Sequence, residues 1–373
     1  MKFSDILGHE NVKERLRAMV DDDRLPHALL LQGPAGVGKF AMARALIQYI
    51  HCENRHDGDS CGCCPACIQQ QSFNHIDTIF SFPVIKGKNR EATSDDYISD
   101  WKDFLKENPY MDFSRWLAAL GNANAKPVMY VEESASLIHK LNFTAHKSRY
   151  KTVVMWLPER MNSECANKLL KLVEEPFADT VFIMVSNTPQ DILPTIYSRT
   201  QRIEMKRLSD DAVASYLSDN MGVDPTDAMA VAHLSEGNMI EAMRQVSLGN
   251  QQRESLELFM RLMREAYKRD IHALRQWSVD VSALGREGEI AFLTYCERMV
   301  RENFIYNLQT RELNYLNRDE AGFSSKFARF ITERNVVKLI DELDSAITDI
   351  AGNANAKMVL FDLAIKVIML IKA

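Results

Sequence analysis

The chain has 373 residues, a length that accommodates two or three domains, and its 46% apolar and 26% charged residues are ordinary for a globular protein. The formal net charge of −6 excludes an overall attraction to nucleic acid, so any DNA contact needs a local basic patch or a partner. Charges interrupt the longest apolar segments and the start lacks the pattern of a signal peptide, so we expect no membrane span and a cytoplasmic location.

The first motif is a glycine-rich loop after a short apolar strand. An amphipathic helix over residues 12–20 leads to a strand at 28–31, followed by the sequence GPAGVGK at 33–39 and a helix over 41–50. In such a loop, backbone N–H groups face phosphate oxygens, the lysine neutralises charge, and a following Ser or Thr binds Mg²⁺. Phe40 replaces that hydroxyl. The pattern predicts a P-loop fold and leaves open whether the loop binds nucleotide or persists for the fold alone.

A cysteine cluster follows the P-loop helix. Five of the seven cysteines lie between residues 52 and 67, which is typical of a metal site in a reducing compartment rather than of a disulfide framework. Four of them have the spacing C-x8-C-x2-C-x2-C, which allows their thiolates to enclose a tetrahedral, structural Zn²⁺ ion: Cys52, Cys61, Cys64 and Cys67. Cys63 is a fifth thiol without an assigned partner. The alternative, a set of reduced free cysteines, is disfavoured by the clustering.

The segment between the cysteines and the next clear strand is the least regular. A polar, basic loop at 86–91 precedes two short amphipathic helices at 97–108 and 113–120. We expect a strand at 128–132 and a helix at 134–143. The basic loop is compatible with a DNA contact, although a solvated loop is the simpler interpretation.

Two apolar strands and the helix between them form the best-defined part of the chain. The runs 153–156 and 181–185 have the unbroken apolar character of strands that are covered on both faces. Between them, Asn162 is expected to cap a helix that ends before Pro176. A polar turn, SNTP, follows the second strand, and the tripeptide SRT at 198–200 comes shortly after it. This order predicts parallel strands joined by a helical crossover.

The remainder of the chain is predicted to be helical. Ser209 caps a first helix, a second covers about 226–235, and a third begins at Asn238, so this segment should form a small helical unit. From residue 251 onward we expect at least four long amphipathic helices. The last of them, at 357–372, is almost wholly apolar and should be buried or face a partner.

The words NKLLKLVEEP at 167–176 and SNTPQDILPTIYSRT at 186–200 resemble the AAA+ domain of clamp loaders, and in particular the delta-prime family of bacterial DNA polymerase III subunits. The resemblance implies an α/β fold class: an AAA+ P-loop domain with a parallel sheet and an inserted zinc module, then an all-α lid and an all-α C-terminal collar. The implied domains are a P-loop domain at 1–206 (zinc module about 51–68, insertion about 84–126), a lid at 207–250 and an oligomerisation collar at 251–373.

The same resemblance assigns roles to individual residues. The residues that would contact ATP or ADP are Gly33, Gly36, Gly38 and Lys39. The four cysteines would hold Zn²⁺, and Arg199 would act as an arginine finger toward the ATP of a neighbouring subunit. Three departures remove catalytic parts: Phe40 replaces the Mg²⁺-binding hydroxyl, Trp156 and Leu157 occupy the acidic positions, and Ile240 lies where the lid arginine is expected. The sequence therefore predicts a subunit that has no competent Mg²⁺ site and does not turn over ATP.

Two classes of function follow from these features. The first is a non-catalytic delta-prime-like subunit of a hetero-oligomeric clamp loader. Its partners would be gamma/tau-like motor subunits, a delta subunit, the sliding clamp and, through the assembly, primer-template DNA, with no membrane contact. The second is a catalytically active AAA+ ATPase of DNA replication or repair with a divergent site. A third and weaker hypothesis, a stand-alone zinc-binding DNA adaptor, conflicts with the acidic charge balance.

Overall fold

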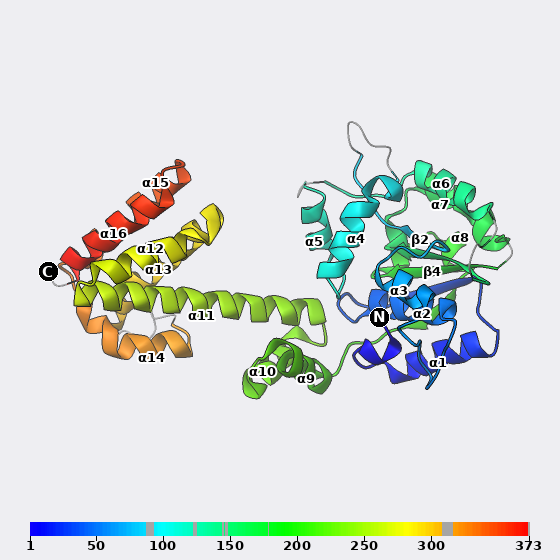
Figure 1. The fold of residues 1–373 in the computed structure, drawn as a ribbon, viewed down its shortest axis with the longest axis horizontal. Coiled ribbons are helices and arrows are strands. Elements are labelled where there is room, and N and C mark those ends of the chain that lie inside the picture. Colours follow the sequence, from blue (N-terminus) through cyan, green and yellow to red (C-terminus); the bar gives the residue numbers. More distant parts are fainter. Residues whose placement is uncertain are drawn as a thin grey trace. The chain divides into compact units, whose positions relative to one another are not determined.

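The structure, a computed structural model, describes residues 1–86, 93–121, 125–143, 145, 148–177, 179–307 and 316–371. The chain forms two compact units, Met1–Val246 and Ser247–Ala373 (Figure 1). Most of the basic loop expected at 86–91 lies outside the described residues, as do residues 122–124 of the expected insertion. Among the residues that are described, no helix combines the length and the apolar character needed to cross a membrane.

The first unit is built on a five-stranded parallel sheet with the strand order β2-β3-β4-β1-β5. The strands are β1 (Ala28–Gln32), β2 (Thr78–Ser81), β3 (Lys151–Trp156), β4 (Thr180–Ser186) and β5 (Gln201–Glu204). The interior strand β1 pairs through Leu31 with Val185 of the central β4 on one side and with Ile203 of the edge strand β5 on the other. The predicted α/β class with a parallel sheet is confirmed, and the strand pair 153–156 and 181–185 lies at its centre.

Helices cover both faces of this sheet because apolar side chains of the strands point to both faces. In β1, Leu29 and Leu31 pack into one core and Leu30 into the other. The first core lies under α2 (Lys39–His51), which follows the P-loop, and the second lies under α6 (Val131–Leu141) and α7 (Ser163–Glu174). The shorter helices of this layer are α1 (Glu10–Asp21), α3 (Pro65–Gln71) and α8 (Pro194–Tyr197), and short 3-10 turns are η1 (Phe3–Asp5), η2 (Ser94–Tyr97), η3 (Pro158–Arg160) and η4 (Pro189–Asp191).

The expected insertion contains α4 (Ile98–Glu107) and α5 (Phe113–Ala119), close to the two helices predicted there. The predicted strand at 128–132 is wrong. Val128 and Met129 form only isolated bridges, with Val84 and Met161, and α6 already begins at Val131. Acidic residues in the first turn of α6 favour a helix start at this point, because they interact well with the positive end of the helix dipole. The short strand β2 was not predicted.

The first unit ends in a small helical subdomain with its own apolar core. It contains α9 (Asp210–Met221), α10 (Pro225–Ser235) and the start of α11 (Met239–Lys268). Ser209 caps α9 as predicted, since its hydroxyl accepts a hydrogen bond from the Ala212 amide at 3.3 Å. The domain boundary expected at 250/251 lies inside the continuous helix α11, whereas the two compact units divide four residues earlier.

The second unit is all α-helical in its described residues, as predicted. Besides the end of α11 it contains α12 (Ile271–Ser282), α13 (Gly285–Asn307), α14 (Arg318–Phe327) with the turn η6 (Ala328–Phe330), α15 (Val336–Ala351) and α16 (Ala356–Leu370). The side chains of Phe259, Trp277 and Phe292 are buried at its centre. The apolar helix expected at 357–372 is α16, which buries one face and leaves Met358 and Met369 largely exposed.

Candidate functional site

The P-loop keeps its expected backbone shape at the end of β1. Gly38 is the N-cap of α2, and the three glycines Gly33, Gly36 and Gly38 all have positive φ angles. At Gly36 the helical subdomain approaches closely: a Cβ there would lie 1.8 Å from the Asn238 side-chain oxygen. The Gly36 carbonyl also accepts a hydrogen bond from the Met239 amide at 3.0 Å. The loop is therefore packed directly against the start of α11.

The lysine of the P-loop is bound by the loop itself. The Lys39 Nζ atom donates a hydrogen bond to the Gly33 carbonyl at 2.7 Å and another to the Pro34 carbonyl, and the residue is 4% exposed. Burial lowers the pKa of Lys39 to about 8, although the nearby charge of Glu159 opposes the shift. The ammonium group that would neutralise a terminal phosphate thus already has two internal partners.

Aromatic rings fill the space beside the loop. Phe40 is buried and meets Trp101 of α4 edge to face, with ring centroids 5.8 Å apart. Trp101 also stacks on Phe82 at 4.0 Å and lies 5.3 Å from Trp156 at the end of β3. The residue that replaces the Mg²⁺-binding hydroxyl and one that replaces an expected acid are therefore joined in one cluster by a tryptophan of the insertion.

Two cavities adjoin the P-loop: one of about 220 Å³ touches it at residues 34–35 on the side of the helical subdomain, and the other lies beside Lys39 and Phe40. The cavity beside Lys39 and Phe40 is too small for a nucleotide. Its volume is about 20 Å³, and Tyr110, from the turn between α4 and α5, faces Lys39 and Phe40 across it. This volume suffices for about one water molecule, whereas pockets for small ligands usually have volumes of about 300–1,000 Å³. Tyr110 also contacts Tyr216 of α9 edge to face at 6.0 Å, so the same residue connects the P-loop with the helical subdomain.

Glu159 is an acidic residue near the P-loop that the sequence analysis missed. It lies in η3, just after β3, and its carboxylate accepts hydrogen bonds from the backbone amides of Asn187 at 2.9 Å and Thr188 at 3.3 Å. The second carboxylate oxygen is buried, and no residue that the structure describes forms a hydrogen bond with it. The sequence did offer a clue, because Glu159 comes three residues after Trp156, the last residue of β3. A search limited to the usual acidic positions, 156 and 157, does not consider residue 159.

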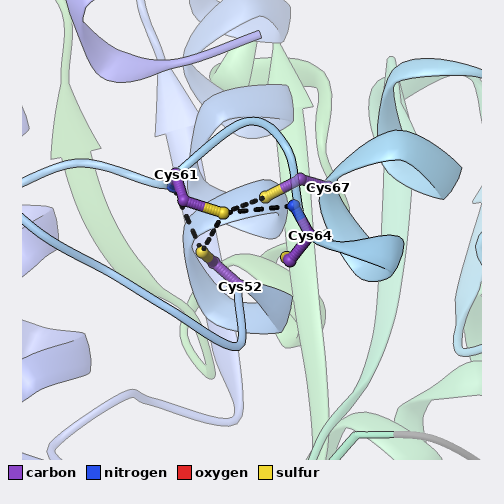
Figure 2. Close-up of side chains that lie close together, drawn as sticks. All are labelled: Cys52, Cys61, Cys64 and Cys67. Atoms are coloured by element: carbon purple, nitrogen blue, oxygen red, sulfur yellow. Dashed lines mark hydrogen bonds between the residues drawn. The ribbon is translucent and has the colours of Figure 1, made fainter.

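The four predicted cysteines come together at the end of α2 (Figure 2). Cys52 follows α2, Cys61 lies in the connecting loop, Cys64 caps α3, and Cys67 belongs to α3. Their sulfur atoms all lie within 4.8 Å of one another, with 3.6 Å between Cys52 and Cys61 and 3.9 Å between Cys61 and Cys67. Four sulfurs at the usual Zn–S distance in a tetrahedron lie about 3.8 Å apart, so the donor set fits a structural Zn²⁺ ion.

The surroundings of the cluster suit thiolate ligands. The Cys61 and Cys64 amides each point at a cysteine sulfur at 3.3 Å, and amides of the loop lower the pKa of the Cys61 thiol to about 6. Asp59 fixes the loop, because its carboxylate accepts hydrogen bonds from the backbone amides of Phe3 and Ser4. Cys63 is exposed and does not belong to the cluster. The cluster can hold a metal ion, and its closed set of four ligands is that of a structural site.

Arg199 lies at the molecular surface between α8 and β5. Its side chain is 37% exposed, forms an ion pair with Glu174 of α7, and donates a hydrogen bond to the Thr195 carbonyl at 2.7 Å. Thr200 donates its hydroxyl hydrogen bond to the Tyr197 carbonyl and thereby helps to end α8. The guanidinium group is thus presented on the surface by short, local contacts.

The structure separates Arg199 from the P-loop of the same chain. Arg199 precedes Gln201, which pairs with Leu29 near the start of β1, while the P-loop follows Gln32 at the other end of that strand. The two groups therefore adjoin opposite ends of β1, whose residues Leu29 and Gln32 are about 10 Å of strand apart. Arg199 is therefore not among the residues that line the two cavities at the P-loop of its own chain.

Comparison with known proteins places the chain in a family. The model of a family described as DNA polymerase III, delta subunit, matches residues 8–209. DNA polymerase III subunit delta′ of Pseudomonas aeruginosa is 28% identical over 219 residues, which are 58% of this chain and 55% of the relative. DNA polymerase III subunit tau of Bacillus subtilis is 24% identical over 247 residues, which are 65% of this chain and 36% of the relative.

The chain thus spans between about a third and about half of the length of these curated relatives. Among solved structures, the Bacillus subtilis DNA clamp loader delta protein is similar with a TM-score of 0.36 and 11% identity, and the match covers 97% of this chain and all of the other. Because the family match extends over more than half of the sequence, this protein belongs to the clamp-loader subunit family of DNA polymerase III.

Proposed function

We propose that this chain is a delta′-like clamp-loader subunit that neither binds nor hydrolyses ATP and that supports the loading of a sliding clamp onto primed DNA by motor subunits. The observation that carries the proposal is the filled P-loop. A cavity of only about 20 Å³ remains beside Lys39 and Phe40, and Lys39 is already hydrogen-bonded to the loop. The proposed subunit therefore shares the fold of the motor subunits but has no nucleotide-binding site.

The chemistry of ATP hydrolysis supports the same conclusion. Hydrolysis requires a metal held by a hydroxyl, an acid near the metal and the attacking water, and positive charge on the transferring phosphoryl group. Phe40 and Trp156 stand at two of these positions and pack against Trp101. Loss of the metal ligand and the acid removes several kcal/mol of barrier stabilisation, on the order of 10³-fold or more in rate.

Arg199 is the group that this subunit would contribute to catalysis in a neighbour. Its ion pair with Glu174 is on the surface, and such pairs contribute only about 0–1 kcal/mol, so the arginine can exchange its partner for a phosphate. An arginine finger supplied by a neighbouring subunit accelerates phosphoryl transfer by about 10³–10⁵-fold. The planar guanidinium group also suits two-point recognition of phosphate oxygens.

The C-terminal unit is the proposed oligomerisation collar. Met358, Ile365 and Met369 form an exposed apolar stripe along α16, because their spacing places them on one face of the helix. Such a stripe is typical of a surface that another subunit covers. The proposed partners are gamma/tau-like motor subunits and a delta subunit, with the sliding clamp and the primer-template DNA engaged through the assembly.

The proposal is tested in an assembly reconstituted with the motor and delta subunits. Arg199→Ala should lower ATP hydrolysis at the neighbouring motor site by about 10³-fold in single-turnover measurements, without releasing any subunit from the assembly. Arg149→Ala is the matched control, since Arg149 also makes an exposed ion pair, with Asp23 at 2.8 Å, but far from α8 in the sequence. Equal rates for the two variants would refute the arginine-finger role.

The second candidate function is an active ATPase with a divergent site, and Glu159 is the observation that favours it. Burial lowers the pKa of Lys39 and the charge of Glu159 opposes that shift, so an acidic residue does lie near the P-loop. However, the Glu159 carboxylate is engaged by the amides of Asn187 and Thr188. The purified chain is expected to show no ATP turnover with Mg²⁺; turnover that is abolished by Glu159→Gln would establish the second function instead.

A further inference from the structure

A groove with an apolar floor and a basic rim crosses the C-terminal unit. It lies between α11 and α14, which run side by side in this unit (Figure 1), and its volume is about 1,070 Å³. The floor includes Met260 and Met263 of α11 and Phe323 and Phe327 of α14. The two phenylalanine rings are stacked at 4.7 Å, which gives the floor a continuous aromatic surface.

The rim of the groove is positively charged although the chain is acidic. Five basic and two acidic side chains line the groove, in a chain whose net charge is −6. At one end, Arg253 lies 3.4 Å from Asp319. Toward the other end lie Arg264 and Lys326, and neither forms an ion pair with any residue that the structure describes. The positive charge of the rim is thus only partly neutralised within the chain.

We infer that this groove binds an acidic amphipathic α-helix of a partner protein, with the helix's apolar face on the Met and Phe floor and its carboxylates on the basic rim. The groove follows α11 from Arg253 to Lys268, which is about 22 Å of helix, so it accommodates about four turns. The volume exceeds the range of about 300–1,000 Å³ that is usual for small molecules. Helices that bind in grooves use apolar anchors three and four residues apart.

The basic rim favours an acidic occupant, and the state of the aromatic rings decides between an acidic helix and a nucleic acid. A single-stranded nucleic acid would also be attracted to the rim, but it is bound through rings that are free to stack on bases. Here Phe327 is buried and its neighbour Phe323 already stacks on it, so the floor offers an apolar surface rather than separate stacking platforms. Met260, which is only partly buried, adds a flexible apolar side chain that adapts to helical ligands.

The test uses the full chain and a fluorescein-labelled peptide of roughly 16 residues, with leucines along one helical face and glutamates at both ends. Fluorescence anisotropy should give saturable binding that weakens as salt is raised. Arg264→Glu should weaken binding by at least about tenfold, because it places a repulsive charge on the rim. Arg301→Glu is the matched control: Arg301 is exposed on α13 of the same unit but does not line the groove.

Several outcomes would overturn the inference. A scrambled peptide of the same composition that binds equally well, or equal affinities of the Arg264 and Arg301 variants, would show that the groove does not select an amphipathic helix. Binding of an oligo-dT strand that is lost in Arg264→Glu, with no binding of the peptide, would assign the groove to nucleic acid. Self-association of the chain that is abolished by Arg264→Glu would assign it to a second copy. The assay uses the isolated chain, so its result does not depend on the proposed role in the clamp loader.

Discussion

Restoring the missing hydroxyl of the P-loop should not restore nucleotide binding. In Phe40→Thr the sequence again matches the full P-loop motif, and reasoning from the motif alone predicts that Mg²⁺ and ATP can bind. The structure leads to the opposite expectation. Tyr110 and the adjoining turn still close the phosphate site, Trp156 still occupies the acidic position, and Lys39 still binds the loop carbonyls.

The substitution should instead be costly for stability. Phe40 is 3% exposed and packs edge-on against Trp101, so its loss leaves a cavity and adds a hydroxyl without an assured partner. Truncation of a buried phenylalanine costs about 3–5 kcal/mol, out of a total of roughly 5–15 kcal/mol for a natural protein. With a urea dependence of about 3 kcal/mol per M, the unfolding midpoint of the first unit should fall by roughly 1–1.7 M.

Two assays test this pair of expectations. Urea unfolding followed by tryptophan fluorescence reports mainly on the first unit, because Trp101, Trp116 and Trp156 lie together there, and titration with a fluorescent ATP analogue and Mg²⁺ measures binding. The control is Phe82→Thr, which removes a ring from the same cluster without altering the P-loop. Micromolar affinity of the Phe40 variant, absent in the control, would refute the argument that the insertion closes the site.

Two further predictions concern the metal cluster and the buried lysine. We expect the reduced, purified protein to contain one zinc ion per chain by mass spectrometry; Cys61→Ser should abolish this zinc, whereas Cys63→Ser should retain it, and equal zinc contents of the two variants would contradict the four-cysteine site. Burial lowers the pKa of Lys39 from 10.5 to about 8 in the folded chain, so between these pH values the unfolded chain binds more protons. Burying the charged lysine therefore lowers the free energy of unfolding by its full amount below pH 8, and this cost falls as the pH rises toward 10.5. The free energy of unfolding of the wild type should therefore rise relative to that of Lys39→Met by about 1.4 kcal/mol per pH unit between pH 8 and 10; a difference between the two proteins that does not change with pH would contradict the prediction.

The sequence allowed prediction of those elements whose signals are local. Asn162 caps α7 through a 2.7 Å hydrogen bond from the Cys165 amide, and the helix ends before Pro176, because capping and proline effects depend on a few neighbouring residues. The cysteine cluster was equally accessible, since its ligand spacing is a property of one short segment. The short strand β2 has only four residues and lies at the sheet edge, so it carries little periodic signal.

The filling of the P-loop could not be predicted in the same way. The sequence showed that Phe40 and Trp156 replace catalytic side chains, but it did not show that Trp101, 61 residues after Phe40, joins them. Contacts of this kind depend on the tertiary fold, and an insertion of unknown course offers no pattern from which to derive them. For the same reason Glu159 was overlooked, since its role depends on the turn at Asn187 that meets it.

The packing around the P-loop also explains why its glycines do not by themselves indicate nucleotide binding. A Cβ at Gly33 would lie 2.1 Å from the Met205 carbonyl oxygen, and one at Gly36 would lie 1.8 Å from the Asn238 side chain. Each glycine is therefore required by the way the loop meets β5 and α11, whether or not a phosphate is present. Lys39 likewise has a structural role through its bonds to two loop carbonyls. A subunit without ATP turnover is therefore expected to keep the glycines and the lysine, because packing requires them. It is expected to lack only the Ser or Thr usual at position 40 and the acids, which no packing contact requires. The sequence has this combination.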